Sequence, residues 1–458
     1  MKVGNETAAR SRSAGGRWGR RWPASCALAL VALLLTAPAL LGGCGVLSGR
    51  PAPGGAAGSG GAAGDPAGRE RSTEQAGGGG TKPAAPEEQV RQAVAALLEA
   101  RAEGLKQGDP APLRRLYDLA SPQGRRAFGH EQRRVDYVRA WTAARHARIV
   151  EVTPRFRLLR ASLAPGKASL RARFIQTLEV AYVYPPARTV NRFAVGTRHD
   201  LEAVREAPAP GAAAAPASSG AEGPGGAGGA SSRGWRIRRD RFTDPLEEDV
   251  LVSRVTPAAV PPGAAGSGAA PPRRGGAGSP RYDRAQAVAY AMRYAGAANG
   301  PSQGYNPRYR DYTDTGGDCT NFISQVLADR EGGGMATDSR WFYSRWWRPG
   351  RPSPIWIQAP DLAAYLVSSG RARLLQKGTF AQVVRPTPLY PAGAIQALED
   401  GDLIGYEEKG HIEHLAVVVG RDSRGYLVVN SHTADRRRVP WDLGWDRETV
   451  FWLLHVVG

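Results

Sequence analysis

The sequence predicts an α+β fold in two folded segments, and three observations indicate it. Apolar residues recur at helical spacing before a series of alternating stretches, a second pattern of helices followed by strands occupies the C-terminal part, and runs rich in Gly, Pro and Ala separate the two. A chain of 458 residues also exceeds the size of one ordinary domain. We therefore expect two domains joined by tethers.

The first element is an export signal. Arg17, Arg20 and Arg21 precede an apolar stretch at 27–41, and Leu41-Gly42-Gly43-Cys44 follows it. Small residues before a cysteine are typical of a lipoprotein signal, so residues 1–44 are predicted to be a signal peptide with Cys44 as the lipidated residue. The alternative is a plain signal peptide or signal anchor. Either interpretation predicts an extracytoplasmic protein, and lipidation would attach it to the cell membrane, facing the cell wall.

The net charge of the chain limits the classes of partner that are expected. Lys and Arg number 61 against 42 acidic residues, a formal net charge of +19. A basic protein outside the cell favours anionic phospholipid headgroups or wall polymers. Nucleic acid is not expected as a partner, because the arginines are dispersed and no zinc-finger spacing or aromatic RNA-binding motif occurs.

The number and positions of the cysteines indicate one candidate nucleophile. Of Cys26, Cys44 and Cys319, the first is removed with the signal and the second would be acylated. A single unpaired thiol is unusual in an oxidising compartment unless its chemistry is used. Cys319 is therefore a candidate nucleophile, and the competing interpretation is a small buried apolar residue.

After a Gly/Ala/Ser/Pro-rich linker at 45–85, a module is predicted over 86–256, with an Ala/Gly-rich insertion at 207–232. A helix should begin at Pro86, and three strands should follow at 149–163, 168–184 and 189–204, with a last one at Trp235. This order of helices and curved strands resembles the nuclear-transport-factor-two-like cone fold. The module carries no nucleophile or metal spacing, so a binding or spacer role is expected for it.

A second linker at 257–280 leads to a domain at 281–458. A helix should open near Tyr282. In Gly316-Gly317-Asp318-Cys319 the glycines permit a tight approach, Asp318 is a suitable N-cap, and the apolar spacing that follows predicts a helix with Cys319 in its first turn. The positive end of that helix would favour the thiolate.

The general base is predicted at His414, which heads the apolar strand 415–420. A second strand at 426–430 follows a short loop. If the loop closes a hairpin about Ser423, His432 lies beside His414 on the neighbouring strand, with Asn430 on the same face. Either Asn430 or His432 could orient the imidazole of His414.

These motifs together resemble the bacterial "putative amidase domain" family, from Tyr282 to about Trp452. The residues that carry the likeness are the Gly-Gly-Asp-Cys-Thr-Asn-Phe-Ile-Ser-Gln run, the upstream Asn306-Pro-x-Tyr309, the Gly-Asp turn at 401–402, and Ser431-His432-Thr433. The family is similar to papain-like, NlpC-type and CHAP hydrolases. The resemblance implies a Cys-bearing helix packed on an antiparallel sheet, with Cys319 as nucleophile and His414 as base. It implies His432 as the third residue, whereas papain-type spacing implies Asn430.

Further site residues are predicted less directly. The Cys319 amide would meet the oxyanion, with Asn306 or Tyr309 as a side-chain donor, and both have a structural alternative. Aromatic residues near the Cys-bearing helix either line a substrate groove beside Asp318 or belong to the core; they include Trp341, Trp346 and Trp347.

The sequence therefore predicts a lipid-anchored cysteine amidase or peptidase that acts on an amide bond, for which peptidoglycan is one suitable substrate. No cofactor or metal is expected, and a monomer is expected. One alternative is a zinc hydrolase using His411, Glu413, His414 and His432, although their spacing is not that of a zinc motif. The other is a non-catalytic envelope-binding protein.

Overall fold

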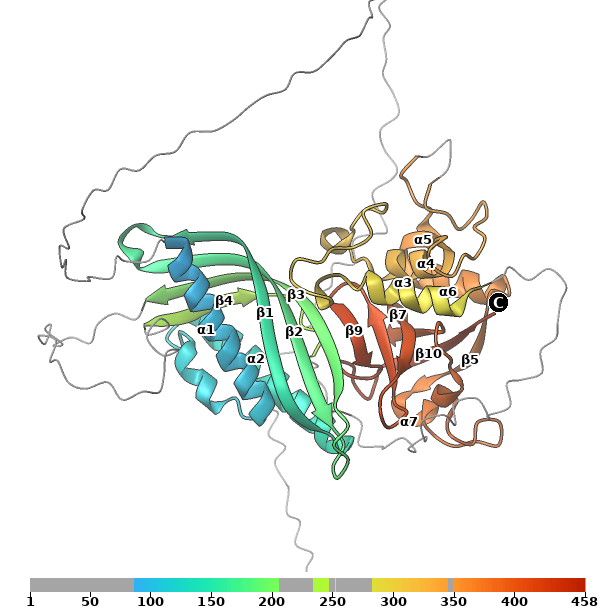
Figure 1. Cartoon of the computed structure of the whole chain (residues 1–458), viewed down its shortest axis with the longest axis horizontal. Helices are drawn as coiled ribbons and strands as arrows, with labels where there is room; N and C mark the ends of the chain where they lie inside the picture. Colours follow the sequence, from blue (N-terminus) through green and yellow to red (C-terminus); the bar gives the residue numbers. More distant parts are fainter. Residues whose placement is uncertain (1–85, 206–233, 247–251, 253–281, 345–348, 458) are drawn as a thin grey trace, which may run out of the picture. The chain divides into compact units, whose positions relative to one another are not determined.

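A computed structural model describes residues 86–205, 234–246, 252, 282–344 and 349–457, which belong to one compact unit (Figure 1). It combines helices with antiparallel strands, as an α+β fold requires. The signal peptide with Cys44, both linkers, the Ala/Gly-rich insertion, Trp346 and Trp347 lie outside the described residues.

The N-terminal segment has the expected order of elements. Two helices come first, and four strands follow them: α1 (Pro86–Gln107), α2 (Pro122–Ala144), β1 (Arg148–Leu163), β2 (Ser169–Val183), β3 (Asn191–Arg205) and β4 (Trp235–Arg241). The start of α2 illustrates the local chemistry, because the Ser121 side chain accepts the Gly124 N–H and Pro122 occupies the first helical position. The predicted bounds of β1, β2 and β3 are confirmed to within two residues, and β4 begins at Trp235 as predicted and continues to Arg241.

A buried ionic cluster occupies the interior of this segment. Asp240 pairs with Arg101 at 2.7 Å and with His199 at 3.1 Å, and the Phe242 ring stacks on His199 at a centroid distance of 4.1 Å. The side chains of Arg101, His199 and Asp240 are all buried. Since each charge has a partner of opposite sign, the cluster is compatible with burial.

The C-terminal segment carries the remaining helices and strands. Its short 3-10 turns include η4 (Gly296–Ala298) and η5 (Thr313–Thr315). The longer elements are α3 (Arg284–Arg293), α4 (Cys319–Ala328), α5 (Pro354–Ile357), α6 (Ala359–Ser368), β5 (Ala372–Thr379), α7 (Phe380–Val383), β6 (Leu403–Glu408), β7 (His411–Arg421), β8 (Leu427–Ser431), β9 (Asp435–Pro440) and β10 (Val450–Val456).

One sheet runs through both segments. Its strand order is β1-β2-β3-β9-β8-β7-β6-β10-β5, with β4 also paired to β3. Along β3, residues 194–196 pair with β9 and residues 200–205 pair with β4. The division into two domains stays a prediction, because the two segments share backbone hydrogen bonds at the β3–β9 contact.

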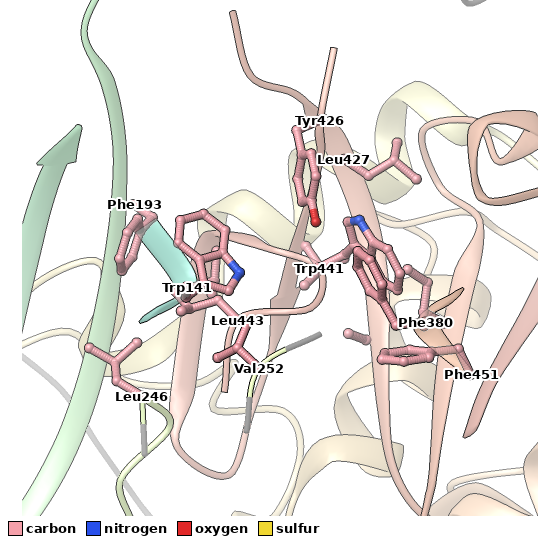
Figure 2. Close-up of a cluster of buried hydrophobic side chains, with 14 of the residues drawn as sticks. Trp141, Phe193, Leu246, Val252, Phe380, Tyr426, Leu427, Trp441, Leu443 and Phe451 are labelled. Carbon is pink, nitrogen blue, oxygen red and sulfur yellow. The ribbon is translucent and has the colours of Figure 1, made fainter. Parts of the chain in front are cut away.

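The two faces of the C-terminal part of the sheet have different covers. Helices α3, α4 and α6 pack on one face, which we call the helical face, through apolar residues such as Phe322, Leu415 and Val417. The opposite face, which we call the shared face, packs against the N-terminal segment in a continuous cluster. Figure 2 shows Trp141 of α2 and Phe193 of β3 near Leu443 and Tyr426 in this cluster.

Among the described residues, none of the helices combines the length and the hydropathy that crossing a lipid bilayer requires.

Candidate active site

Cys319 begins helix α4, as the sequence predicts. Asp318 stands at the N-cap position, but its side chain makes no capping hydrogen bond. It accepts instead from the Tyr312 N–H at 2.9 Å and from the Asn321 side chain at 2.8 Å. Gly317 before it has a φ of 109°, a conformation that favours glycine, and a Cβ there would lie 3.3 Å from the Thr433 hydroxyl.

The Cys319 thiol is buried against the start of strand β7. Burial raises its pKa, while hydrogen bonds from the Thr320 hydroxyl and the Leu415 backbone N–H act in the opposite direction. The expectation of a favoured thiolate is therefore wrong for this structure, because desolvation outweighs the positive end of the helix. The resting group is a thiol.

His414 lies on the shared face of the sheet. It pairs with Tyr406 across β6 and β7, so the two side chains point the same way, and the His414 and Trp445 ring centroids are 5.6 Å apart. Leu415 points to the helical face. In the described part of the chain, no hydrogen bond joins the imidazole to Cys319, and His414 Nε2 is buried without a partner.

His414 is neutral in this environment. Burial lowers its pKa to about 3, and the positive charge of Arg436, followed by that of His432, acts in the same direction. The site thus holds an uncharged thiol and an uncharged imidazole, rather than a thiolate paired with an imidazolium.

The predicted register of the β7–β8 hairpin is wrong. Val417 pairs with Asn430, one residue away from the expected alignment, and a bulge follows between Val418 and Gly420. A shift of one residue exchanges the faces to which side chains point. His432 and Asn430 therefore face the helices, while His414 faces the opposite side.

His432 is buried in a tight structural site. Its Nδ1 lies 2.6 Å from Asp318 Oδ2 and its Nε2 lies 2.7 Å from the Tyr294 carbonyl oxygen. The ring is stacked between Tyr305 and Phe322, at centroid distances of 3.7 and 3.9 Å. Since both ring nitrogens meet acceptors, the geometry favours a doubly protonated ring paired with the Asp318 carboxylate.

Asn430 is also engaged in packing. Its Nδ2 donates to the Ala291 carbonyl oxygen of α3 at 2.9 Å, and its Oδ1 accepts the Arg438 N–H at 2.8 Å. The structure brings neither His432 nor Asn430 into contact with the His414 ring nitrogens. Both residues instead fix helices α3 and α4 to the sheet.

The two side chains expected as oxyanion donors have other partners. Asn306 is buried, donates to the Tyr290 hydroxyl at 2.8 Å and accepts the Arg308 N–H at 3.0 Å. The Tyr309 hydroxyl donates to Asp329 at 2.6 Å. The structural alternative is therefore favoured for both. The Cys319 amide donates to no other group among the described residues and is available to an oxyanion.

Trp341 belongs to the core and not to a groove. It is fully buried, and its indole N–H donates to Ser324 at 3.0 Å. Its ring packs against Trp356 at a centroid distance of 5.6 Å. The expectation of a substrate groove is wrong for Trp341.

The histidines named for the zinc alternative do not converge. His411 is exposed at the start of β7, and His414 and His432 lie on opposite faces of the sheet. In the part of the chain that the structure describes, no group of three or more His, Cys, Asp or Glu side chains is placed to hold a metal ion.

The sequence interpretation missed the groups that surround His414 on the shared face. Arg436 pairs with Ser431 across β8 and β9, and its guanidinium lies 5.2 Å from the Trp445 ring centroid. The buried Ser431 hydroxyl and Trp445 indole N–H have no partner in the described part of the chain. No motif marked these residues, because only the β8–β9 register and the loop after β9 bring them together.

Comparison with known proteins finds similarity in the C-terminal segment. Residues 281–454 match the family model described as "Putative amidase domain". A protein of Bacillus subtilis (strain 168), the uncharacterised protein YhbB, is 30% identical over 164 residues, which are 35% of this chain and 44% of that protein. The chain thus spans less than half of this relative's length. No solved structure matches.

Proposed function

We propose that this protein hydrolyses an amide bond with Cys319 as nucleophile and His414 as general base. The observation that carries the proposal is that the Leu415 backbone N–H lies close enough to the Cys319 sulfur to lower its pKa, because this seats the thiol beside the residue that follows His414. The match of residues 281–454 to an amidase domain supports the same class of reaction.

The proposed step starts from two uncharged groups. His414 points to the shared face while helix α4 packs on the helical face, so in the proposed step the thiol proton reaches His414 Nε2 through water around the start of β7, as the sulfur attacks the amide carbon. Its lack of a partner leaves this nitrogen able to accept. The Cys319 N–H meets the oxyanion. The imidazolium then protonates the leaving nitrogen, the C–N bond breaks, and water hydrolyses the thioester.

A decisive test uses the full chain and purified peptidoglycan, beside a panel of peptide amides, with mass spectrometry of the released products. Cys319→Ala and His414→Ala should each abolish turnover, and a thiol-alkylating reagent should do the same. Turnover that survives Cys319→Ala would contradict the proposal. Loss with a chelator but not with the thiol reagent would favour the zinc alternative instead.

Peptidoglycan is the proposed substrate because a basic surface suits anionic wall polymers. The formal net charge of +19 falls to +14 when residues 1–43, with six basic residues and one acidic residue, are removed, so the mature chain stays basic. Release of fragments from peptidoglycan, with little cleavage of unrelated peptides, would support this choice. Binding to the wall without release, in a protein that retains Cys319 and His414, would favour a non-catalytic binding role.

The predicted lipid anchor belongs to the same proposal. Cys44 follows two glycines and an apolar stretch, which suits a lipoprotein signal. Cys44→Ala should move the protein from the detergent phase to the aqueous phase in a phase-separation assay of cell extracts. An unchanged distribution would favour a signal anchor.

A further inference from the structure

The groups beside His414 include a loop that the N-terminal segment holds in place. This loop, residues 442–445 between β9 and β10, carries Trp445. The Trp445 ring stacks on Tyr406 with a centroid distance of 4.2 Å and lies 5.6 Å from the His414 ring. Any movement of the loop therefore changes what covers the proposed base.

The Tyr137 hydroxyl of helix α2 anchors the end of the loop, while the Trp141 indole and the Arg145 guanidinium hold Asp442 at its start. Tyr137 Oη donates to the Trp445 carbonyl oxygen at 2.7 Å and accepts the N–H groups of Gly444 and Trp445 at 2.9 and 3.1 Å. Tyr137 is buried. Removal of the hydroxyl leaves the Trp445 carbonyl oxygen and the Gly444 N–H without this partner, whereas the Trp445 N–H keeps the Asp442 carbonyl oxygen at 3.2 Å.

The segment that follows β4 reinforces this anchor. The Pro245 carbonyl oxygen accepts from Arg436 Nη2 at 3.1 Å, and Arg436 Nη1 donates to the Leu443 carbonyl oxygen at 2.8 Å. A Cβ on Gly444 would lie 2.0 Å from the same Pro245 oxygen. The guanidinium that faces His414 thus takes its position from both segments.

We propose that the N-terminal segment is a working part of the hydrolase, in which Tyr137 is a positioning residue that holds Trp445 and Arg436 against His414. The inference rests on the proposed role of His414. It departs from a spacer or separate binding role for residues 86–256, because the contacts run to groups beside the proposed base rather than to a remote surface. The other ionisable groups around His414 are Tyr406 of β6 and His432 after β8.

The test is Tyr137→Phe in the full chain, with Tyr184→Phe as the matched control. Tyr184 also carries a buried hydroxyl from the N-terminal segment to the C-terminal one, donating to Asp422 at 2.6 Å, but Asp422 lies in the β7–β8 turn, away from His414. Two readouts apply. One is the pH profile of kcat/KM, and the other is the NMR titration of the His414 ring, assigned by its loss in His414→Gln.

We expect Tyr137→Phe to lower kcat/KM at least ten-fold and to let His414 titrate at a higher pH, because water reaches the ring once the loop is released. Tyr184→Phe should leave both readouts as in the wild type. An unchanged His414 titration in folded Tyr137→Phe, or an equal effect of Tyr184→Phe, would overturn the inference. If Tyr137→Phe does not fold, Trp445→Leu tests the same contact from the loop side and should raise the titration in the same way.

The two readouts separate this inference from the proposed function. The NMR titration needs no substrate, so a shift in Tyr137→Phe supports the positioning contact even if the wild type cleaves no amide. If the wild type cleaves an amide, but Tyr137→Phe changes neither kcat/KM nor the His414 titration, the positioning role is refuted and the proposed function is not.

Discussion

At the scale of single residues, the chemistry of the site follows from burial more than from formal charge. Cys319 and His414 each lose the charged form that exposure would allow, because neither is stabilised by a neighbouring charge of opposite sign. The charged pair at the start of helix α4 is Asp318 with His432. This pair fixes the helix to the sheet and takes no part in the proposed proton transfer.

The lowered pKa of His414 predicts how stability depends on pH. The unfolded chain takes up the proton near pH 6.5 and the folded protein only near 3, so the stabilisation is present above pH 6.5 and is lost as the pH falls toward 3. Between pH 7 and 4.5 this group alone should cost about 2–3 kcal/mol. Urea unfolding at both pH values should show a smaller loss in His414→Gln than in the wild type.

His411→Gln provides the control for this measurement, since His411 is exposed on the same strand. It should lose as much stability as the wild type between the two pH values. An equal loss in His414→Gln would show that His414 does not remain neutral in the folded protein.

The Asp318–His432 pair predicts strong coupling. Both side chains are fully buried. Asp318→Asn or His432→Gln alone leaves one buried charge without its partner and should cost about 3–5 kcal/mol of unfolding free energy. The double variant should cost clearly less than the sum, which chemical denaturation of all four proteins would measure. Asp314→Asn, on a side chain that is 91% exposed, should change little.

At the scale of elements, the helices and strands were largely predictable and their register was not. The period of the apolar residues located α1, β1, β2, β3 and the Cys-bearing helix. The bulge between Val418 and Gly420 has no comparable signal, yet it decides that His432 faces the helices. The sequence could therefore place Cys319 at the start of a helix and His414 near the start of a strand, but it could not choose the groups around them.

The close contact between β3 and η4 predicts that one methyl group added at Gly196 destabilises the protein. A Cβ on Gly196 would lie 2.6 Å from the carbonyl carbon of Ala297, and the nearby Thr177 hydroxyl donates to the Ala297 carbonyl oxygen at 2.6 Å. Gly196→Ala should therefore destabilise the protein by about 1–3 kcal/mol, measured by urea unfolding.

Gly129→Ala is the matched control for this substitution. Gly129 lies in helix α2, and the nearest atom that its Cβ would meet is Arg133 Nη1 at 3.7 Å. Because alanine has the higher helix propensity, this variant should gain about 0.5–1 kcal/mol. A neutral Gly196→Ala would mean that β3 and η4 are not in close contact.

At the scale of the whole molecule, the shared face packs together two segments that the composition predicts to be separate domains. The Gly/Pro-rich run at 257–280 predicts two domains, but Trp141, Phe193, Tyr426 and Trp441 belong to one apolar cluster. Composition cannot reveal this, since an apolar face that packs on a neighbour and one that packs on its own helices have the same pattern.

The shared cluster predicts the behaviour of a truncated chain. Residues 281–458 alone would expose the apolar side chains that face the N-terminal segment, including Tyr426 and Leu443. We expect this fragment to bind a hydrophobic dye and to aggregate, whereas residues 86–458 should remain monomeric in size-exclusion chromatography. A monomeric, cooperatively unfolding fragment 281–458 would contradict the shared core.

The short pairing of β3 with β9 also bears on synthesis of the chain. When residues 194–196 leave the ribosome, β2 can already cover one edge of β3, but the strand that completes the other edge begins only at Asp435. Nascent chains must therefore carry an open strand edge until translation nears its end, and open edges invite pairing between molecules. Chaperone demand during synthesis should be greatest for chains that stop short of β9.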